Sequence, residues 1–251
     1  MKILELKKFD KTQRLNLIDE IRGFLIICMV VYHALYSISY CFYSPVFNDM
    51  FSFFSPVQPV FAAMFIFISG FCCVLSRSNF IRGFKLFIIA LLITLVTAVF
   101  LPEQIIVFGI LHMLSISMML YDALKPIILK IPEVIGIILC VFFFVLTFNI
   151  SMGKIGPFLL PRGVYRINWL FPIGICGYKF YSADYFPLFP WMFIFFLGSF
   201  IGLIGIKNGF FKCMYKKRCK ILSIIGKHTL LIYIAHQPII YVIIWFVKLF
   251  K

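Results

Sequence analysis

Long apolar stretches of about 20 residues, separated by short polar or basic segments, make up most of the chain. Stretches of this length with few charges are typical of helices that cross a membrane. The pattern predicts seven such helices: 16–40, 54–76, from Arg82 to near Pro102, from the turn at Glu103 to Asp122, 133–150, 188–206 and 224–248. A loop is predicted at 41–53.

The segment 151–187 has a different pattern, because glycine and proline recur along it. Its piece 163–180 is apolar but short and interrupted, which favours a re-entrant or interfacial segment over a full span. We therefore expect an all-α, polytopic transmembrane bundle of about seven spanning helices plus this segment. The chain is expected to form a single domain over 1–251.

The distribution of basic residues predicts the orientation. With the N-terminus in the cytosol, 18 of the 24 Lys and Arg residues lie on the inner side, as the positive-inside rule requires. Treating 163–180 as a full span would place the basic cluster 207–220 outside, which disfavours that arrangement.

Composition supports a membrane protein, since 63% of the residues are apolar and 13% are charged. The net charge of +15 reflects basic loops that meet anionic lipid headgroups, and no nucleic-acid motif is present. Eight cysteines form no CxxC pair, and no Cys/His spacing for a metal appears. No metal and no nucleic-acid partner are therefore expected.

Three histidines lie inside apolar helices: His33, His112 and His236. Ionisable groups are costly in the membrane interior, so each one is a candidate functional residue. Their similar predicted depth suggests one shared polar cavity. The alternative is that each imidazole bonds a local backbone or hydroxyl group and packs the bundle.

Charged and amide residues suggest further roles. Asp19 can pair with both Arg14 and Arg22, and these ion pairs would hold the start of the first helix in place. Asp184 either orients a ligand or caps the helix that begins at 188, and Gln237 follows His236. No glycine-rich phosphate loop is present, so a phosphate-bearing ligand would need basic side chains predicted at the inner face: Arg14, Arg22, Arg82, Lys85 and Lys227. Taken singly, each of these also fits positive-inside topology.

The opening Arg14-x4-Asp19-x2-Arg22-Gly23, followed by an apolar run to His33, resembles the opening of the transmembrane acyltransferases. Four further pieces resemble the catalytic domain of the heparan-α-glucosaminide N-acetyltransferase family over nearly the whole chain: FAAMFIFISGF (61–71), FGILHMLS (108–115), DYFPLFPWMFIFFLGSFIG (184–202) and GKHTLLIYIAHQPII (226–240).

The resemblance implies transfer of an acetyl group from cytosolic acetyl-CoA to an amino sugar at the far side of the membrane. A histidine would serve as general base or as transient acetyl carrier. In the lysosomal member the proposed catalytic histidine lies in the loop after the first helix, whereas the segment 41–53 here has none. The role is therefore expected to pass to His33, alone or shared with His112 or His236.

The expected function is a membrane acetyltransferase with acetyl-CoA as co-substrate and a sugar or glycan as acceptor, placed by Asp184 and Gln237. The chain is shorter than the lysosomal enzyme, so heparan is not expected as the acceptor. Abundant Ile, Phe and Lys suggest an AT-rich microbial genome, hence a bacterial plasma membrane and a cell-envelope glycan. Lipids are expected partners, and a homodimer is left open. The alternatives are a transporter that relays protons through its histidines, and a lipid-binding scaffold.

Overall fold

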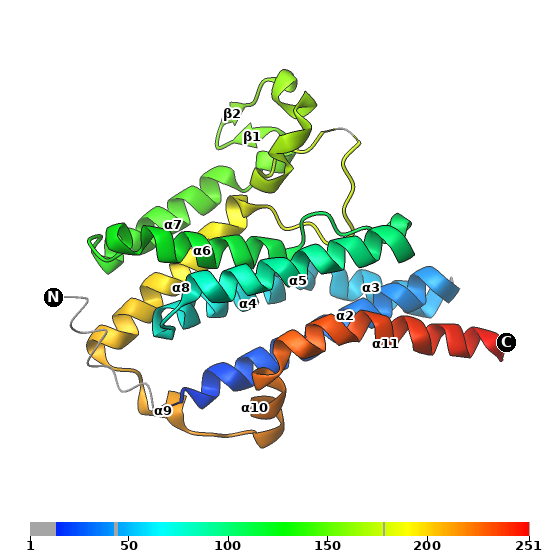
Figure 1. Cartoon of the computed structure of the whole chain (residues 1–251), viewed down its shortest axis with the longest axis horizontal. Helices are drawn as coiled ribbons and strands as arrows, with labels where there is room; N and C mark the ends of the chain where they lie inside the picture. The colour runs from blue at the N-terminus through cyan, green and yellow to red at the C-terminus, as the bar shows by residue number, and fades with distance from the viewer. Residues whose placement is uncertain (1–13, 43–44, 178, 251) are drawn as a thin grey trace. The chain divides into compact units, whose positions relative to one another are not determined.

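The computed structural model describes residues 14–42, 45–177 and 179–250. It is helical over most of this length and confirms the predicted all-α, polytopic fold (Figure 1). Its long helices are α2 (Asn16–Phe42), α4 (Gln58–Leu75), α5 (Asn79–Phe100), α6 (Ile110–Ile128), α7 (Glu133–Thr147), α8 (Leu188–Asn208) and α11 (Thr229–Leu249). Its short elements are α3 (Pro45–Phe54), α9 (Lys212–Tyr215), α10 (Lys220–Lys227) and the antiparallel strands β1 (Lys154–Ile155) and β2 (Phe158–Leu159).

By length and apolar composition, six of the described helical segments could cross a membrane: α2, Pro45–Leu75, α5, Glu133–Met152, α8 and α11. α6 is not among them, although it is 19 residues long. Ten of its residues are buried, so its polar side chains lie inside the protein, where they can find partners. The seven crossings expected from sequence stay a prediction.

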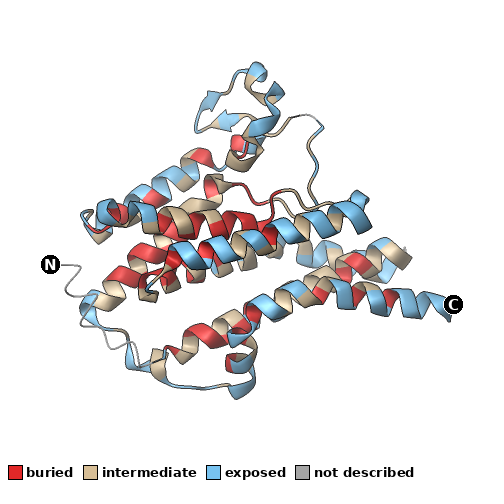
Figure 2. Ribbon diagram, viewed as in Figure 1, coloured by how far each residue is buried: buried red, intermediate tan, exposed pale blue. Residues whose placement is uncertain are grey.

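Many helix positions are exposed (Figure 2), and many of the exposed side chains are large and apolar. Leu95 on α5, Ile138 on α7 and Val242 on α11 are each at least 60% exposed. In water such surfaces would be unfavourable, whereas lipid chains solvate them well. The protein is therefore an integral membrane protein.

The chain forms two compact units. In the unit that spans 66–209, α5 packs against α6 and α7 packs against α8. α4 and α8 also touch backbone to backbone, because a Cβ on Gly70 would lie 1.8 Å from the carbonyl oxygen of Phe195. Small residues at such crossings allow the close helix approach that is common in membranes.

The other unit combines the two ends of the chain, 10–65 and 210–251. Here α2 packs against α10 and α11. Residues of α2 and α11 meet in ascending order: Arg22 bonds Thr229, His33 lies against His236, and Lys248 lies over the ring of Phe42. The first and last long helices are therefore parallel neighbours.

Three boundaries differ from the prediction. The helix expected from the turn at Glu103 to Asp122 is α6, which begins at Ile110 and continues to Ile128. The segment 41–53 is not a loop, since α3 occupies Pro45–Phe54; proline suits a first helical position, and the apolar residues after it favour a helix. The predicted helix 224–248 is divided, because α10 ends at Lys227 and α11 begins at Thr229, with His228 between them in a non-helical conformation.

The piece 163–180 forms no long helix. It contains two short 3₁₀ turns, Arg162–Arg166 and Asn168–Ile173. Pro172 lies inside the second turn, and Gly174 ends it with a left-handed backbone (φ 102°). This agrees with a segment that does not span the membrane as a helix.

Candidate active site

Two of the three predicted histidines lie side by side. The ring centroids of His33 on α2 and His236 on α11 are 5.1 Å apart, with the planes tilted by 50°. Tyr32 and Tyr233 pack their rings against the pair, each with its centroid 5.5 Å from the imidazole of the histidine on its own helix. Because α2 and α11 are parallel neighbours, residues 203 positions apart in sequence form one polar cluster.

The orientation of the His236 ring is fixed by its own helix. Its Nδ1 lies 2.6 Å from the carbonyl oxygen of Tyr233. A carbonyl can only accept a hydrogen bond, so in the neutral ring Nδ1 carries the proton and Nε2 has the free lone pair. That Nε2 atom is buried and has no hydrogen-bond partner among the described residues.

Two more buried oxygens near these positions in sequence lack partners in the described part of the chain: Oε1 of Gln237 and Oγ of Ser37. Ser37 follows His33 by four residues, so both lie on the same side of α2. Buried polar groups are nearly always satisfied, and unpaired ones at a helix contact suggest a place for water or ligand. Ser37 was not predicted as a site residue, because its helical spacing from His33 is its only signal in the sequence.

Arg22 lies eleven residues before His33, roughly 16 Å along the helix. Its Nη2 donates to Oγ1 of Thr229 at 2.9 Å, and its Nε is buried with no partner among the described residues. Arg22 therefore does not pair with Asp19, contrary to the prediction. The Thr229 hydroxyl at the start of α11 accepts the hydrogen bond from the Arg22 guanidinium, while the Asp19 carboxylate pairs with Arg14.

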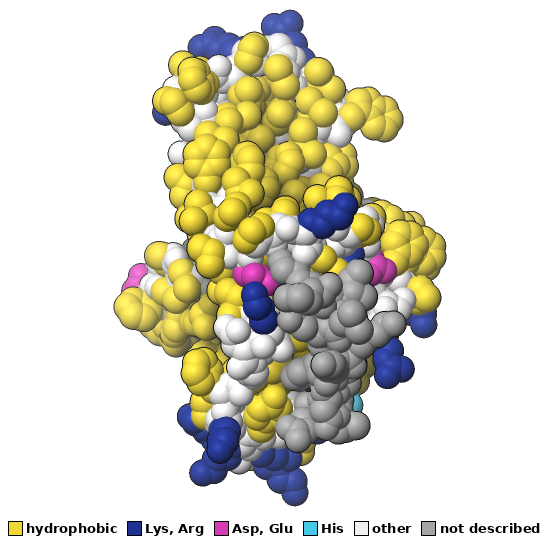
Figure 3. Space-filling model, turned by 90° about the vertical axis from the view of Figure 1, so that its left-hand side faces the viewer, with side chains coloured by type: hydrophobic (Ala, Val, Ile, Leu, Met, Phe, Trp, Pro, Cys, Tyr) yellow, Lys and Arg dark blue, Asp and Glu magenta, His cyan; other side chains and the backbone are white. Residues whose placement is uncertain are grey.

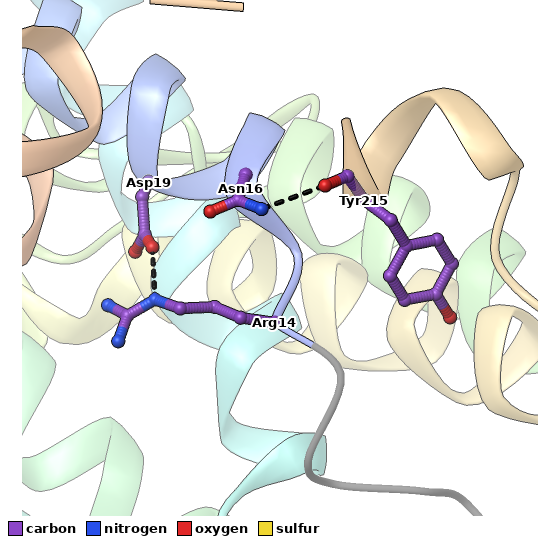
Figure 4. A network of polar contacts seen from close by, with 4 residues as sticks. All are labelled: Arg14, Asn16, Asp19 and Tyr215. Atoms are coloured by element: carbon purple, nitrogen blue, oxygen red, sulfur yellow. Dashed lines mark hydrogen bonds and ion pairs between the residues drawn. The ribbon is translucent and has the colours of Figure 1, made fainter. Parts of the chain in front are cut away.

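At the start of α2, Arg14 Nε donates to Asp19 Oδ2 at 2.5 Å, which confirms this half of the predicted ion-pair group (Figure 4). Nearby, the Asn16 amide donates to the carbonyl of Tyr215. Glu20, whose role the sequence did not indicate, is buried. It accepts hydrogen bonds from the backbone N–H groups of Arg218 at 2.7 Å and Cys219 at 3.0 Å. These contacts fix α9 and α10 onto α2.

His112 belongs to the unit that spans 66–209 and has local partners for both ring nitrogens. Nδ1 accepts from the N–H of Gly109 at 3.3 Å, and Nε2 lies 3.4 Å from Oγ1 of Thr94. Asp184 Oδ2 accepts from the N–H of Ile110 at 3.1 Å. Both side chains thus satisfy the start of α6. Asp184 caps α6 instead of α8, because the extended segment before α8 runs beside residues 105–108.

The five basic residues expected to bind a donor do not all lie in one unit. Arg14, Arg22 and Lys227 belong to the unit with the histidine pair, whereas Arg82 and Lys85 lie on α5. Arg22 is partly buried, and the other four are exposed. Among the described residues, no group of three or more His, Cys, Asp or Glu side chains is arranged to hold a metal ion.

The fold and this cluster define a class: an integral membrane protein with an oriented imidazole pair between its first and last long helices. The family described as heparan-alpha-glucosaminide N-acetyltransferase, catalytic, matches residues 14–238. The chain belongs to this family, and its class is therefore that of a membrane acetyltransferase. Enzymes of this type use acetyl-CoA as co-substrate. No curated protein and no solved structure matches the chain.

Proposed function

We propose that the protein transfers an acetyl group from cytosolic acetyl-CoA to an amino sugar or other glycan at the far side of a bacterial plasma membrane. The His33–His236 pair would be the reacting centre. The observation that carries this proposal is the His236 ring, whose Nδ1 is held by the Tyr233 carbonyl while Nε2 is buried and unpartnered. Family membership supplies the reaction class.

The Nε2 lone pair suits either route of transfer. As a general base, it takes the proton of the acceptor amine or hydroxyl while that group attacks the thioester carbonyl. The carbon–sulfur bond then breaks, and the CoA thiolate leaves and takes up the proton. As a nucleophile, Nε2 would carry the acetyl group between two such steps. His33, with its ring 5.1 Å away, would share the proton or serve as the second base.

Arg22 is the best candidate among the predicted donor ligands. It is held by Thr229 on the same two helices as the histidine pair, and its buried Nε could meet a phosphate. The separation of roughly 16 Å from His33 suits a donor whose phosphates and thioester are joined by a long pantetheine arm. Arg14 and Lys227, which belong to the same unit, would attract the nucleotide electrostatically from exposed positions.

Acceptor placement falls first to Gln237, whose buried Oε1 can accept from a hydroxyl or amine. Asp184 lies in the other unit, where its carboxylate accepts from the start of α6. By the same reasoning, His112 would position α6 and would not react itself, because both its nitrogens have partners.

The decisive experiment is turnover of labelled acetyl-CoA by purified protein. We expect His236→Asn and His33→Asn each to lower turnover by about 10²–10⁴-fold, the usual contribution of a positioned base. His228→Asn is the matched control, because this exposed histidine lies at the break between α10 and α11. Wild-type turnover in His236→Asn that unfolds at the wild-type temperature would contradict the assignment.

The paired imidazoles also fit a proton relay, which is the transporter alternative. Reconstitution in liposomes separates the two functions. Saturable uptake of a substrate with no turnover of acetyl-CoA would favour the transporter. Acetylated acceptor formed only when acetyl-CoA is outside and acceptor inside would favour transfer across the membrane.

A further inference from the structure

The exposed apolar face of α7 continues beyond the end of the helix. On α7 itself, Ile138 and Val145 are 60% and 65% exposed. Ile150 is buried, but four apolar residues beyond it are more exposed than these two: Met152 80%, Phe158 74%, Leu159 75% and Trp169 86%. In Figure 3 an apolar surface covers the upper part of the face in view, with Lys and Arg side chains at its upper edge.

α7 is too short to cross a bilayer unaided. Its 15 residues extend roughly 22 Å at 1.5 Å per residue, whereas the hydrocarbon core is about 30 Å thick. The 3₁₀ turn Ile150–Met152 completes the 20-residue segment Glu133–Met152, which is long enough to cross, so the chain that follows Met152 lies at the boundary between hydrocarbon and headgroups. The apolar side chains at 148–159 are therefore placed where lipid can cover them.

This tip is held in a defined conformation. Gly153 and Gly156 have positive φ angles of 85° and 53°, which glycine adopts without strain. The N–H of Gly156 donates to the carbonyl of Leu146 at 2.7 Å, and the Tyr165 hydroxyl donates to the carbonyl of Ile150. The hairpin and the first 3₁₀ turn are thus both tied to the end of α7.

Basic residues alternate in sequence with the apolar residues of this tip. Lys154, Arg162, Arg166 and Lys179 are all exposed, and the sequence 134–183 contains no Asp or Glu. Long basic side chains lay their stems on apolar surface and extend their charges to the headgroups. An anionic membrane surface attracts each of these charges. Trp169 adds an aromatic ring of the kind enriched at that depth.

We propose that residues 148–169 form a membrane-boundary anchor that selects anionic phospholipid headgroups. The aliphatic part of the surface favours lipid over a glycan, because exposed Met152 and Leu159 are solvated by acyl chains and offer little to a sugar. The basic residues of this segment, with no Asp or Glu among them, favour anionic over zwitterionic headgroups. The anchor does not depend on the acetyltransferase chemistry, and its test does not use activity.

Trp169 is a native reporter for this anchor, since the chain has only three tryptophans. In the double variant Trp191→Phe, Trp245→Phe, placed in phosphatidylcholine nanodiscs, we expect brominated phosphatidylcholine to quench Trp169 emission and iodide in the buffer to quench it little. Brominated phosphatidylglycerol at the same mole fraction should quench at least about twice as strongly. If the double variant unfolds, the emission of Trp169 is obtained by subtracting the emission of the Trp169→Phe variant from that of the wild-type protein.

Arg162→Gln with Arg166→Gln should abolish the preference for phosphatidylglycerol and leave quenching by phosphatidylcholine. Lys130→Gln, an exposed basic residue outside the segment, is the control that keeps the preference. Equal quenching by both lipids in the parent protein would overturn the headgroup selectivity. Strong iodide quenching without lipid quenching would overturn the anchor, and relief of that quenching by an added anionic glycan would reassign the surface to a polymer.

Discussion

At the scale of single residues, four buried polar atoms of α2 and α11 have no partner among the described residues: Arg22 Nε, Ser37 Oγ, His236 Nε2 and Gln237 Oε1. Each such atom costs about 1–3 kcal/mol when it remains unpaired. The other polar groups at the start of α2 are satisfied, as Arg14, Asp19 and Glu20 show. Unpaired atoms also occur at Asn79, Tyr121 and Ser223, and the proposed function assigns to a ligand or water only the four on this helix pair.

Ser37 gives a direct test of that interpretation. Its side chain is fully buried and unpaired, so Ser37→Ala should leave stability unchanged or raise it by about 1 kcal/mol. If the hydroxyl meets a ligand, acetyl-CoA turnover should fall at the same time. Ser115→Ala is the matched control, because that buried hydroxyl donates to the carbonyl of His112 at 2.7 Å; its loss should cost about 0.5–1.5 kcal/mol.

Thermal unfolding in detergent and acetyl-CoA turnover measure the two effects separately. A Ser37→Ala protein that loses as much stability as Ser115→Ala would show that the hydroxyl has a structural partner. Unchanged stability together with unchanged turnover would remove Ser37 from the site.

Glu20 is predicted to contribute through structure. Its carboxylate accepts two backbone N–H bonds just before α10, where negative charge is also favoured by the helix dipole. Glu20→Ala should destabilise the protein by about 1–3 kcal/mol, and Glu20→Gln should lose less because its amide oxygen still accepts. Asp49→Ala, at an exposed position of α3, should stay within about 0.5 kcal/mol. Equal unfolding temperatures for the Glu20 and Asp49 alanine variants would contradict this role.

At the scale of helices, α10 lies unusually close to α2. A Cβ on Gly226 would lie 1.7 Å from the carbonyl oxygen of Asp19, and one on Gly23 would lie 2.1 Å from that of Leu222. Neither contact can be relieved by turning a side chain, because the obstacle is backbone. The helices must separate if either glycine gains a side chain.

Gly226→Ala should therefore destabilise the unit formed by the two chain ends by about 1–3 kcal/mol, the usual cost of overpacking. Gly163→Ala is the matched control, since a Cβ there meets nothing within 4 Å. The unfolding temperature of each purified variant measures the difference. If the Gly226→Ala and Gly163→Ala variants both unfold at the wild-type temperature, α10 does not pack on α2 as described.

Helix existence could be predicted from the apolar pattern, because it is a local property of the chain. α2, α5, α7 and α8 begin and end within a few residues of the expected positions. The break at His228 and the helix at Pro45–Phe54 could not be predicted in this way. A pattern of apolar and basic residues does not distinguish a bend from a continuous helix, or a short helix from a loop. The partners of Asp184 and Arg22 depend on contacts between distant segments, and no spacing along one helix reveals them.

The site was predictable only in part for the same reason. His33 and His236 were identified by the cost of an ionisable group in an apolar helix, and the structure places their rings together. Ser37 and Glu20 carry no such signal, because serine and a glutamate near a helix start are common. A shared cavity that also includes His112 stays a prediction.

At the scale of the whole molecule, the parallel order of α2 and α11 bears on the number of crossings. Two parallel spanning helices need an odd number of crossings between them. The candidate spans between them are Pro45–Leu75, α5, Glu133–Met152 and α8, which is an even number. Adding α6 makes it odd, so the order supports seven crossings with α6 as a true span.

Single cysteines on either side of α6 test this count. In a background without the eight native cysteines, Glu103→Cys and Lys130→Cys, both at exposed positions, should react with a membrane-impermeant maleimide from opposite sides of sealed vesicles. Leu249→Cys at the end of α11 should react from the same side as Glu103→Cys. Labelling of positions 103 and 130 from one side would show that α6 does not cross.

The pairing of α2 with α11 also has a consequence for biosynthesis. The ribosome delivers α2 before α11, so the imidazole pair cannot exist until all the helices between them have been synthesised. Until then Arg22 and His33 on α2 lack the contacts that α11 provides. A nascent chain arrested before α11 would thus hold α2 in the membrane without the imidazole that His236 supplies.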